Sequence, residues 1–543
     1  MVDAALLASL IIVPILLLLF NVLLIARYAD KEAAKGHYCS LVLVILLFFI
    51  SEFTVLLFSI DVGNKGGLAN LTGDPLASTS SLDIALLWQG LFFTIVVLLV
   101  FVVPFSIFYY EESDEGETPN RVRRLCGFNL HQALCLSILY ELVVLFIAGS
   151  ILAITFTLAS KAHLDISSLI VPINIFVPPN PSQQSCGSGS CTFKKGILDI
   201  DTTFVVYAAA LTCGVSNVLF SIYLGVGFIS LPYYGVTNFI SRPKILSTID
   251  ATNARGKLRV RSSELFEIAD DLGKRMADAA EQNFLFKSRS NESISWFSGR
   301  ARRNAGLQTE FKRLKLLSAS LENDLESFHL SDPLKWKQFY NPWLFILQLA
   351  GGVVAGFFSL FWILHVILFM LFSPPVSGFF NSVLSAMDKG FPPASTLLIF
   401  LLTCHLLLSA MAGAFSLGTR IFFINVHQME VGKTLLNSFF FNAGLVLLLT
   451  LPLVQFLSDA FASYGQHSET AVFGTQFRSI DGFQTLYKYN VFLFLMLSMS
   501  LLSLLYFCFC PNRAAQTKSL LKKLKENIKK RPERREIELT TWK

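Results

Sequence analysis

The chain has 543 residues, of which 53% are hydrophobic and only 15% are charged. A soluble globular chain of this size carries about a quarter charged residues, so the composition excludes a soluble enzyme. Apolar runs of roughly 20 or more residues recur between residues 4 and 510, and each is long enough to cross a hydrocarbon core of about 30 Å. The sequence therefore predicts an all-α, polytopic integral membrane protein.

Nine transmembrane helices are predicted from these runs. The first run resembles a signal peptide in length, but no basic region precedes it and no small-residue cleavage site follows it, so we expect a membrane helix there too. The predicted spans are residues 4–26, 38–61, 84–110, 132–158, 204–232, 342–373, 396–424, 435–463 and 488–510.

The distribution of basic residues predicts the orientation of the chain. Short loops rich in Lys and Arg stay on the cytoplasmic side of a membrane. The side that holds the loops after spans 1, 3, 5 and 7 and the C-terminal tail carries 37 of the 44 Lys and Arg residues. We therefore expect the N-terminus outside the cell or in a lumen, and the C-terminus in the cytosol.

Charge and hydropathy divide the chain into four parts. Residues 1–232 form a five-span membrane domain, 233–341 a cytosolic helical hairpin, 342–510 a four-span membrane domain and 511–543 a basic cytosolic tail. The tail has 11 Lys and Arg residues against four Glu, a balance that favours attraction to anionic lipid. Nucleic-acid binding is not expected, because the basic residues lack interleaved aromatic residues and the tail is tethered to a bilayer.

Two apolar seams with helical spacing predict the hairpin, in the manner of a short coiled coil. Antiparallel arms that bury each other's seam are one interpretation. A seam that docks a cytosolic partner is the other. The seam residues are Leu265, Ile268, Leu272, Met276 and Ala279 in the first arm, and Phe311, Leu314, Leu321, Leu325 and Phe328 in the second.

Two features of the outer loops test the predicted orientation. Cys186 and Cys191 flank a flexible Gly-Ser-Gly-Ser segment, and we expect them to form a local disulfide, with a pair of free thiols as the alternative. Asn70-Leu-Thr72 is a glycosylation sequon on the same side, whereas Asn291-Glu-Ser293 falls on the cytosolic side. Only Asn70 should therefore carry a glycan.

Polar residues at membrane depth are costly unless they are paired or hydrated, so they mark functional candidates. Glu52 in span 2 and Glu141 in span 4 are the clearest, and they either line a ligand path or make buried structural contacts. Arg420 and Asp459 lie near span ends, where side chains can reach the interface. Further polar residues in the spans can be explained by hydrogen bonds between helices, namely Gln89, Asn217, Gln348, Asn437, Asn442 and Gln455.

Motifs for catalysis, cofactors and metals are not found in the sequence. There is no His-Glu-x-x-His, phosphate loop, Gly-x-Ser-x-Gly elbow or paired Cys-x-x-Cys, and Gly225-Val-Gly227 is too short for a nucleotide fingerprint. We expect neither an enzyme nor a resident cofactor.

Five further stretches of the sequence are distinctive, namely Val102–Glu112, Arg242–Lys244, Pro374–Pro375 with Asn381, Asn437–Leu445 and Leu486–Phe492. Through them the chain resembles the limb-region-one membrane protein family, and the likeness is greatest to its plant and algal branch. This family includes the lipocalin-interacting membrane receptor and lysosomal cobalamin-transport proteins. The resemblance implies nine spans and an outside N-terminus. It also implies one of two roles: a receptor that internalises a lipocalin-like protein, or an accessory or exporter for a cobalamin-like small molecule.

Three functional hypotheses follow. The first is a receptor or trafficking component, located in the plasma membrane or endosomes, that binds an extracellular or luminal ligand through loops such as 161–203. The second is a lysosomal or vacuolar transporter with a path near Glu52 and Glu141. The third is a membrane-anchored signalling scaffold that acts through the hairpin.

Overall fold

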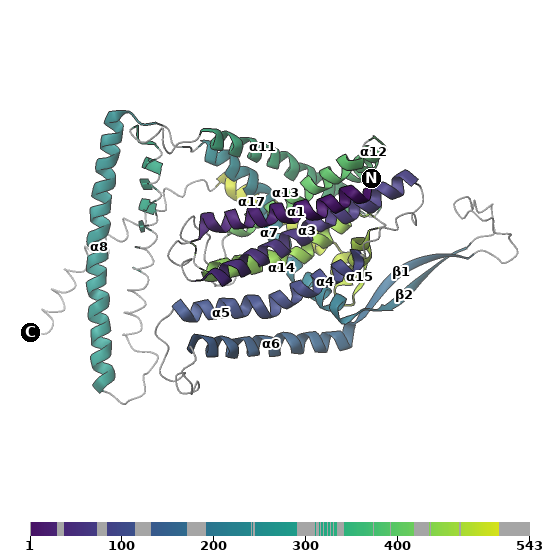
Figure 1. Ribbon diagram of the computed structural model, residues 1–543, viewed down its shortest axis with the longest axis horizontal. Helices are drawn as coiled ribbons and strands as arrows, with labels where there is room; N and C mark the ends of the chain where they lie inside the picture. Colours follow the sequence, from purple (N-terminus) through teal and green to yellow (C-terminus); the bar gives the residue numbers. More distant parts are fainter. Residues whose placement is uncertain are drawn as a thin grey trace, which may run out of the picture. The chain divides into compact units, whose positions relative to one another are not determined.

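The computed structural model describes most of the membrane region and part of the hairpin (Figure 1). The described residues are 2–29, 37–72, 84–114, 132–170, 192–240, 242, 245–289, 310, 314, 317–318, 320–322, 324–325, 327–329, 331–333, 342–372, 374–390, 392–417, 434, 436–465 and 468–509.

Long helices dominate the described chain. In chain order the elements are α1 (Val2–Tyr28), α3 (Tyr38–Thr72), α4 (Ile84–Val97), η1 (Leu98–Val102), α5 (Val103–Asp114), α6 (Gln132–Ala159), β1 (Lys161–Ile170), β2 (Thr192–Asp201), α7 (Phe204–Ile240), α8 (Thr248–Arg289), α11 (Pro342–His365), η4 (Val366–Met370), α12 (Phe379–Gly390), α13 (Pro392–Leu417), α14 (Leu436–Ala460), α15 (Glu469–Ser479), α16 (Gln484–Lys488) and α17 (Val491–Phe509).

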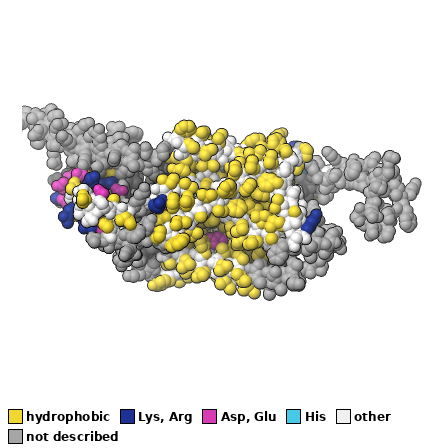
Figure 2. Space-filling view, turned by 90° about the horizontal axis from the view of Figure 1, so that it is seen from above, with side chains coloured by type: hydrophobic (Ala, Val, Ile, Leu, Met, Phe, Trp, Pro, Cys, Tyr) yellow, Lys and Arg dark blue, Asp and Glu magenta, His cyan; other side chains and the backbone are white. Residues whose placement is uncertain are grey.

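Nine helices within the described residues are long and apolar enough to cross a membrane. They coincide with the nine predicted spans, which confirms a polytopic helical membrane protein. Figure 2 shows the expected surface, a broad hydrophobic face with Lys and Arg side chains at its two edges. The spans are Ile11–Tyr28, Tyr38–Val62, Ile84–Tyr110, Leu134–Ala159, Phe204–Ile240, Pro342–Met370, Ala394–Ala414, Leu436–Ala460 and Val491–Phe509.

Helix α14 is the centre of the membrane bundle. It packs against α3, α5, α13 and α15, so helices from the two ends of the sequence form one compact unit, drawn from residues 1–234 and 352–504. In the most apolar stretch of α14, 89% of the residues are buried, whereas none of the corresponding stretch of α6 is. α6 is therefore peripheral and available to lipid.

Glycines allow α7 to approach its neighbours closely. A Cβ at Gly227 or Gly413 would lie 1.8 Å from a backbone oxygen of the facing helix, Ser409 on α13 or Tyr223 on α7. Gly225 faces α17 in the same way, since a Cβ there would lie 2.4 Å from the oxygen of Met496. The Gly-Val-Gly segment thus serves helix packing, as small residues commonly do in membranes.

Two membrane helices contain a π-helical turn, which the sequence analysis did not predict. η1 directly precedes Pro104, a residue that cannot donate the backbone hydrogen bond of a regular helix. η4 continues α11 at the end where that helix leaves the membrane region. Such turns insert an extra residue and redirect side chains, and they are frequent at functional sites.

A two-stranded antiparallel hairpin follows α6 and was also not predicted. β1 pairs with β2 from Lys161 opposite Asp201 to Ile170 opposite Thr192. The hairpin projects from the end of the bundle at which α6 ends and α7 begins (Figure 1). Its base is fixed by pairing of Ala162 with Ile480, just after α15.

The second compact unit, drawn from residues 235–351 and 505–543, contains the helical hairpin. Leu265 and Ile268 of α8 pack with Leu317, and Leu272 and Phe328 are also buried. Ion pairs connect Arg255 to Asp332, Arg261 to Asp324 and Arg275 to Glu310, and this order requires antiparallel arms. The arms therefore bury part of each other's seam, as in the first of the two interpretations of the sequence, whereas Met276 and Leu325 of the seam are exposed.

Candidate functional site

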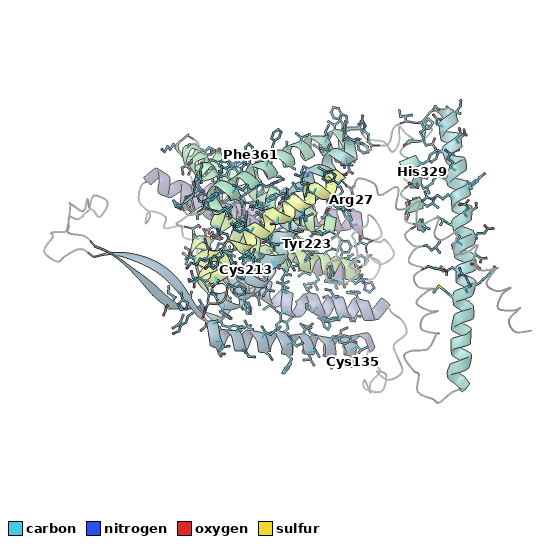
Figure 3. All side chains as sticks on the ribbon, turned by 180° about the vertical axis from the view of Figure 1, so that it is seen from behind. Arg27, Cys135, Cys213, Tyr223, His329 and Phe361 are labelled. Carbon is cyan, nitrogen blue, oxygen red and sulfur yellow. The ribbon has the colours of Figure 1, made fainter. Side chains whose placement is uncertain are left out.

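A cavity of about 280 Å³ lies in the membrane unit, at the end where α14 ends and α17 begins. Its lining combines polar side chains with aromatic and aliphatic ones, and the aromatic and aliphatic residues are called the apolar wall. Figure 3 locates it, because Cys213, labelled near the base of β1 and β2, lies one helical turn before Asn217 on α7. The lining residues are Asn217, Phe220, Ser221, Phe369, Met370, Phe372, Pro375, Gln455, Phe456, Asp459, Ala462, Ser463, Arg478, Tyr487, Asn490, Phe492, Leu493 and Met496.

An ion pair forms the charged part of the lining. Arg478 donates from Nη1 to Asp459 Oδ1 at 3.0 Å, and Gln455 donates from Nε2 to the same oxygen at 3.2 Å. Asp459 occupies the last turn of α14 and Arg478 the last turn of α15, two helices that pack together. The pair therefore depends on the position of α15.

Hydrogen bonds at the start of α15 fix that position. Ser468 is the N-cap, and its hydroxyl accepts a hydrogen bond from the backbone N–H of Ala471 at 3.3 Å. Asp61 of α3 accepts two further bonds at 3.1 Å, from the N–H and the hydroxyl of Thr470. A carboxylate at this end also complements the helix dipole.

Tyr487 and Asn217 form the second polar contact of the lining. The Asn217 amide donates from Nδ2 to the phenolic oxygen of Tyr487 at 3.0 Å. Burial raises the pKa of the Tyr487 phenol well above its ordinary value, so the phenol keeps its proton at neutral pH. The lining thus contains one acid, one base and neutral polar groups.

Asn490 forms the junction between the cavity and α17. Its φ of +53° is a left-handed conformation that Asn tolerates better than most residues. The side chain donates from Nδ2 to the backbone oxygen of Leu371 at 3.1 Å, just after η4. This contact fastens the beginning of α17 to the π-helical end of α11.

The apolar wall is held by contacts around the end of α14. Phe220 and Phe456 lie with ring centroids 5.8 Å apart, and η4 contributes Phe369 and Met370. His365 donates from Nε2 to the Ala460 oxygen at 2.9 Å, and Asn381 donates to the same oxygen at 3.2 Å. The wall is therefore fixed by three separate segments of the chain.

The two membrane carboxyl groups singled out from the sequence lie away from this cavity. Glu52 is buried and accepts a hydrogen bond from Asn21 of α1, with 2.7 Å between Nδ2 and Oε2. Glu141 of α6 is buried too, and neither of its carboxylate oxygens has a hydrogen-bond partner among the described residues. Neither residue lines the cavity, and a ligand path near them stays a prediction.

The other predicted sites are only partly described. Cys186, Cys191, Asn291, Arg420 and the tail 511–543 lie outside the described residues. Asn70 lies in the final turns of α3, which continues to Thr72 beyond the predicted end of span 2. The described residues contain no cluster of three or more potential metal ligands.

Five polar residues of the cavity were not predicted, namely Ser221, Ser463, Arg478, Tyr487 and Asn490. Arg478 and Tyr487 lie between the predicted spans 8 and 9, where polar residues are ordinary, and the others are uncharged residues within or at the ends of spans, so composition did not distinguish them. Tyr487 and Asn490 belong to the stretch Leu486–Phe492, which in the sequence indicates the family and not a site.

The fold and the cavity define a class: a polytopic helical membrane protein with a ligand-sized, partly polar cavity at one end of its bundle. The chain belongs to the LMBR1-like membrane protein family, whose model matches residues 6–295 and 304–505. The resemblance drawn from the sequence is thereby confirmed.

Relatives from plants and an amoeba match nearly the whole chain. A LIMR family protein of Oryza sativa subsp. japonica is 29% identical, over 93% of this chain and 96% of its own length. One from Arabidopsis thaliana has the same identity and coverage, and one from Dictyostelium discoideum is 24% identical over 94% and 98%. No solved structure matches the chain.

Proposed function

We propose that the protein is a receptor or trafficking component that binds a small extracellular or luminal ligand in the cavity at the end of the bundle. The supporting observation is the cavity itself, whose lining contains an ion pair and amide groups together with aromatic side chains. Ligand sites commonly combine a largely apolar lining with a few placed polar groups.

The position of the cavity supports binding from one side of the membrane. It lies at the end of the bundle that the distribution of Lys and Arg predicts to face outward. At about 280 Å³ it lies just below the usual range of about 300–1,000 Å³. A cobalamin-like molecule is larger than this cavity, so the cavity favours a smaller ligand.

A plug at the mouth of the cavity tests this function. Ala462 is exposed and lines the cavity, so Ala462→Trp should fill it without disturbing a buried contact. Leu501→Trp, on the outward face of α17, is the matched control. Small molecules retained by the full chain in lipid nanodiscs are identified by mass spectrometry. A molecule present in wild type and control but absent from the plugged variant supports the proposal, and equal retention in all three contradicts it.

The cellular location separates the receptor from the transporter. The protein is tagged after Lys543 and expressed at native level. A plasma-membrane or endosomal signal supports a receptor that undergoes endocytosis. A lysosomal or vacuolar signal supports a transporter instead.

The transporter is retained as a second candidate because the carboxyl group of Glu141, in a membrane helix, has no hydrogen-bond partner in the part of the chain that the structure describes. Such groups often mark ion or substrate pathways. Substitution of both Glu52 and Glu141 by Gln should then reduce substrate flux across isolated organelle membranes. Unchanged flux by folded protein argues against transport. The scaffold is less favoured, since Leu265 and Ile268 of the hairpin seam are already buried against Leu317 of the second arm.

A further inference from the structure

The cavity lining is electrically neutral as a whole but carries two separate charges. Among the described residues that line it, Asp459 is the one acid and Arg478 the one base. A ligand with a single net charge would leave this partly buried site with an uncompensated charge, which is costly away from water. A ligand with one group of each charge keeps the site neutral and can add a second partner to each member of the ion pair.

The ion pair uses only part of each side chain. Both hydrogen bonds that described residues make to Asp459 go to Oδ1, and none goes to Oδ2. Arg478 has five N–H donors, of which one is used within the described part of the chain, and its side chain is 46% exposed. The free guanidinium donors suit a carboxylate or phosphate, and the free carboxylate oxygen suits an ammonium group.

The apolar wall gives the ligand a third group to recognise. Phe220, Phe456 and Phe492 line the cavity beside the charged pair. Aromatic faces attract an ammonium group and also bury an apolar substituent. The small volume limits the ligand to a few functional groups.

We infer that the cavity binds a small zwitterion, which joins one ammonium group and one carboxylate or phosphate to a short apolar body. This inference rests on the proposed ligand-binding function and specifies the ligand of that site. The chemistry has two sources, a free amino-acid-like molecule or the zwitterionic headgroup of a lipid, and the test distinguishes them.

The test compares three probes that share one apolar body: L-phenylalanine, phenethylamine without the carboxylate, and 3-phenylpropanoate without the ammonium group. Binding to the full chain is measured by calorimetry in phosphatidylglycerol nanodiscs. We expect L-phenylalanine to bind at least tenfold more tightly than phenethylamine and 3-phenylpropanoate. Free glycerophosphocholine, whose phosphodiester carries one charge, should likewise bind at least tenfold more tightly than choline. The inference is overturned if the singly charged probes bind as tightly as the zwitterions, or if no free zwitterion binds in these nanodiscs.

Two variants assign the charges. Arg478→Gln should abolish the preference for L-phenylalanine over phenethylamine. Asp459→Asn should abolish the preference for L-phenylalanine over 3-phenylpropanoate. Lys488→Gln, an exposed position outside the lining, should leave both preferences unchanged. A variant that weakens all three probes equally indicates a structural role and contradicts the assignment.

The lipid source is tested by changing the nanodisc. If a headgroup occupies the cavity, phosphatidylcholine nanodiscs should weaken L-phenylalanine binding severalfold relative to phosphatidylglycerol nanodiscs. Equal affinity assigns the site to a free zwitterion. The outcome of the Ala462→Trp experiment separates the two proposals. If the molecule lost from this variant carries a net charge, only the zwitterion inference is overturned. If no molecule is lost from this variant, the proposed function is overturned as well.

Discussion

Gly227 of α7 faces the backbone oxygen of Ser409 on α13 so closely that a Cβ at position 227 would lie 1.8 Å from that oxygen. The neighbour is backbone, so it cannot move aside as the end of a flexible side chain could. The two helices can therefore keep this crossing only with glycine at position 227.

Substitution Gly227→Ala should force α7 and α13 apart and lower the free energy of unfolding by about 1–3 kcal/mol, as overpacking does. The thermal unfolding midpoint of the full chain in nanodiscs measures the effect. Gly149→Ala on α6 is the control, because nothing lies within 4 Å of its added Cβ. Equal midpoints for the two variants would contradict the close crossing.

Asn21→Leu should destabilise the protein through Glu52. The amide of Asn21 provides the hydrogen bond to the buried carboxyl group, and loss of such a partner costs about 1–3 kcal/mol. Adding Glu52→Leu should recover part of the loss, because an apolar pair leaves no polar group unsatisfied. The same unfolding midpoints are compared, and a double variant no more stable than Asn21→Leu would count against this contact.

Leu317→Ala should loosen the helical hairpin. The side chain is fully buried against Leu265 and Ile268, and truncation of a buried Leu costs about 2–5 kcal/mol. Trypsin should then cut the many basic sites of α8 faster in the full chain. Phe266→Ala is the control, since Phe266 is 77% exposed. Identical cleavage of both variants would show that Leu317 does not hold the arms together.

Orientation is tested at the two sequons. We expect Asn70→Gln to remove a glycosidase-sensitive mass shift from the protein and Asn291→Gln to have no effect, because only the first sequon is predicted to be outside. A shift that depends on Asn291 would reverse the predicted topology.

The membrane fold could be predicted because each span is a long apolar run, a signal that needs no knowledge of neighbouring helices. The π-helical turns could not, since η4 depends on how α11 packs near α14. The strand pairing had a weak local signal in Ala162, Leu164 and Ile166, which alternate with polar residues, but its partner strand begins beyond residue 190.

The cavity was predictable only in part. Asn217, Gln455 and Asp459 were noticed as polar residues within spans, and the structure brings all three to one lining. Glu52 and Glu141 are the stronger candidates by sequence, because a carboxyl group is the costliest group to place within a membrane span. The convergence of Arg478 with Asp459 depends on the placement of α15, which is set by Asp61 more than 400 residues earlier in the chain.

The length of α8 has a mechanical consequence. Its 42 residues, at a rise of 1.5 Å each, form a rod of about 63 Å, roughly twice the thickness of a hydrocarbon core. Ion pairs to the second arm recur along it, at Arg255, Arg261 and Arg275, and resist bending. A protein bound at one end of this rod would therefore displace the other end as a lever does, whereas a flexible tether of the same length would absorb the movement.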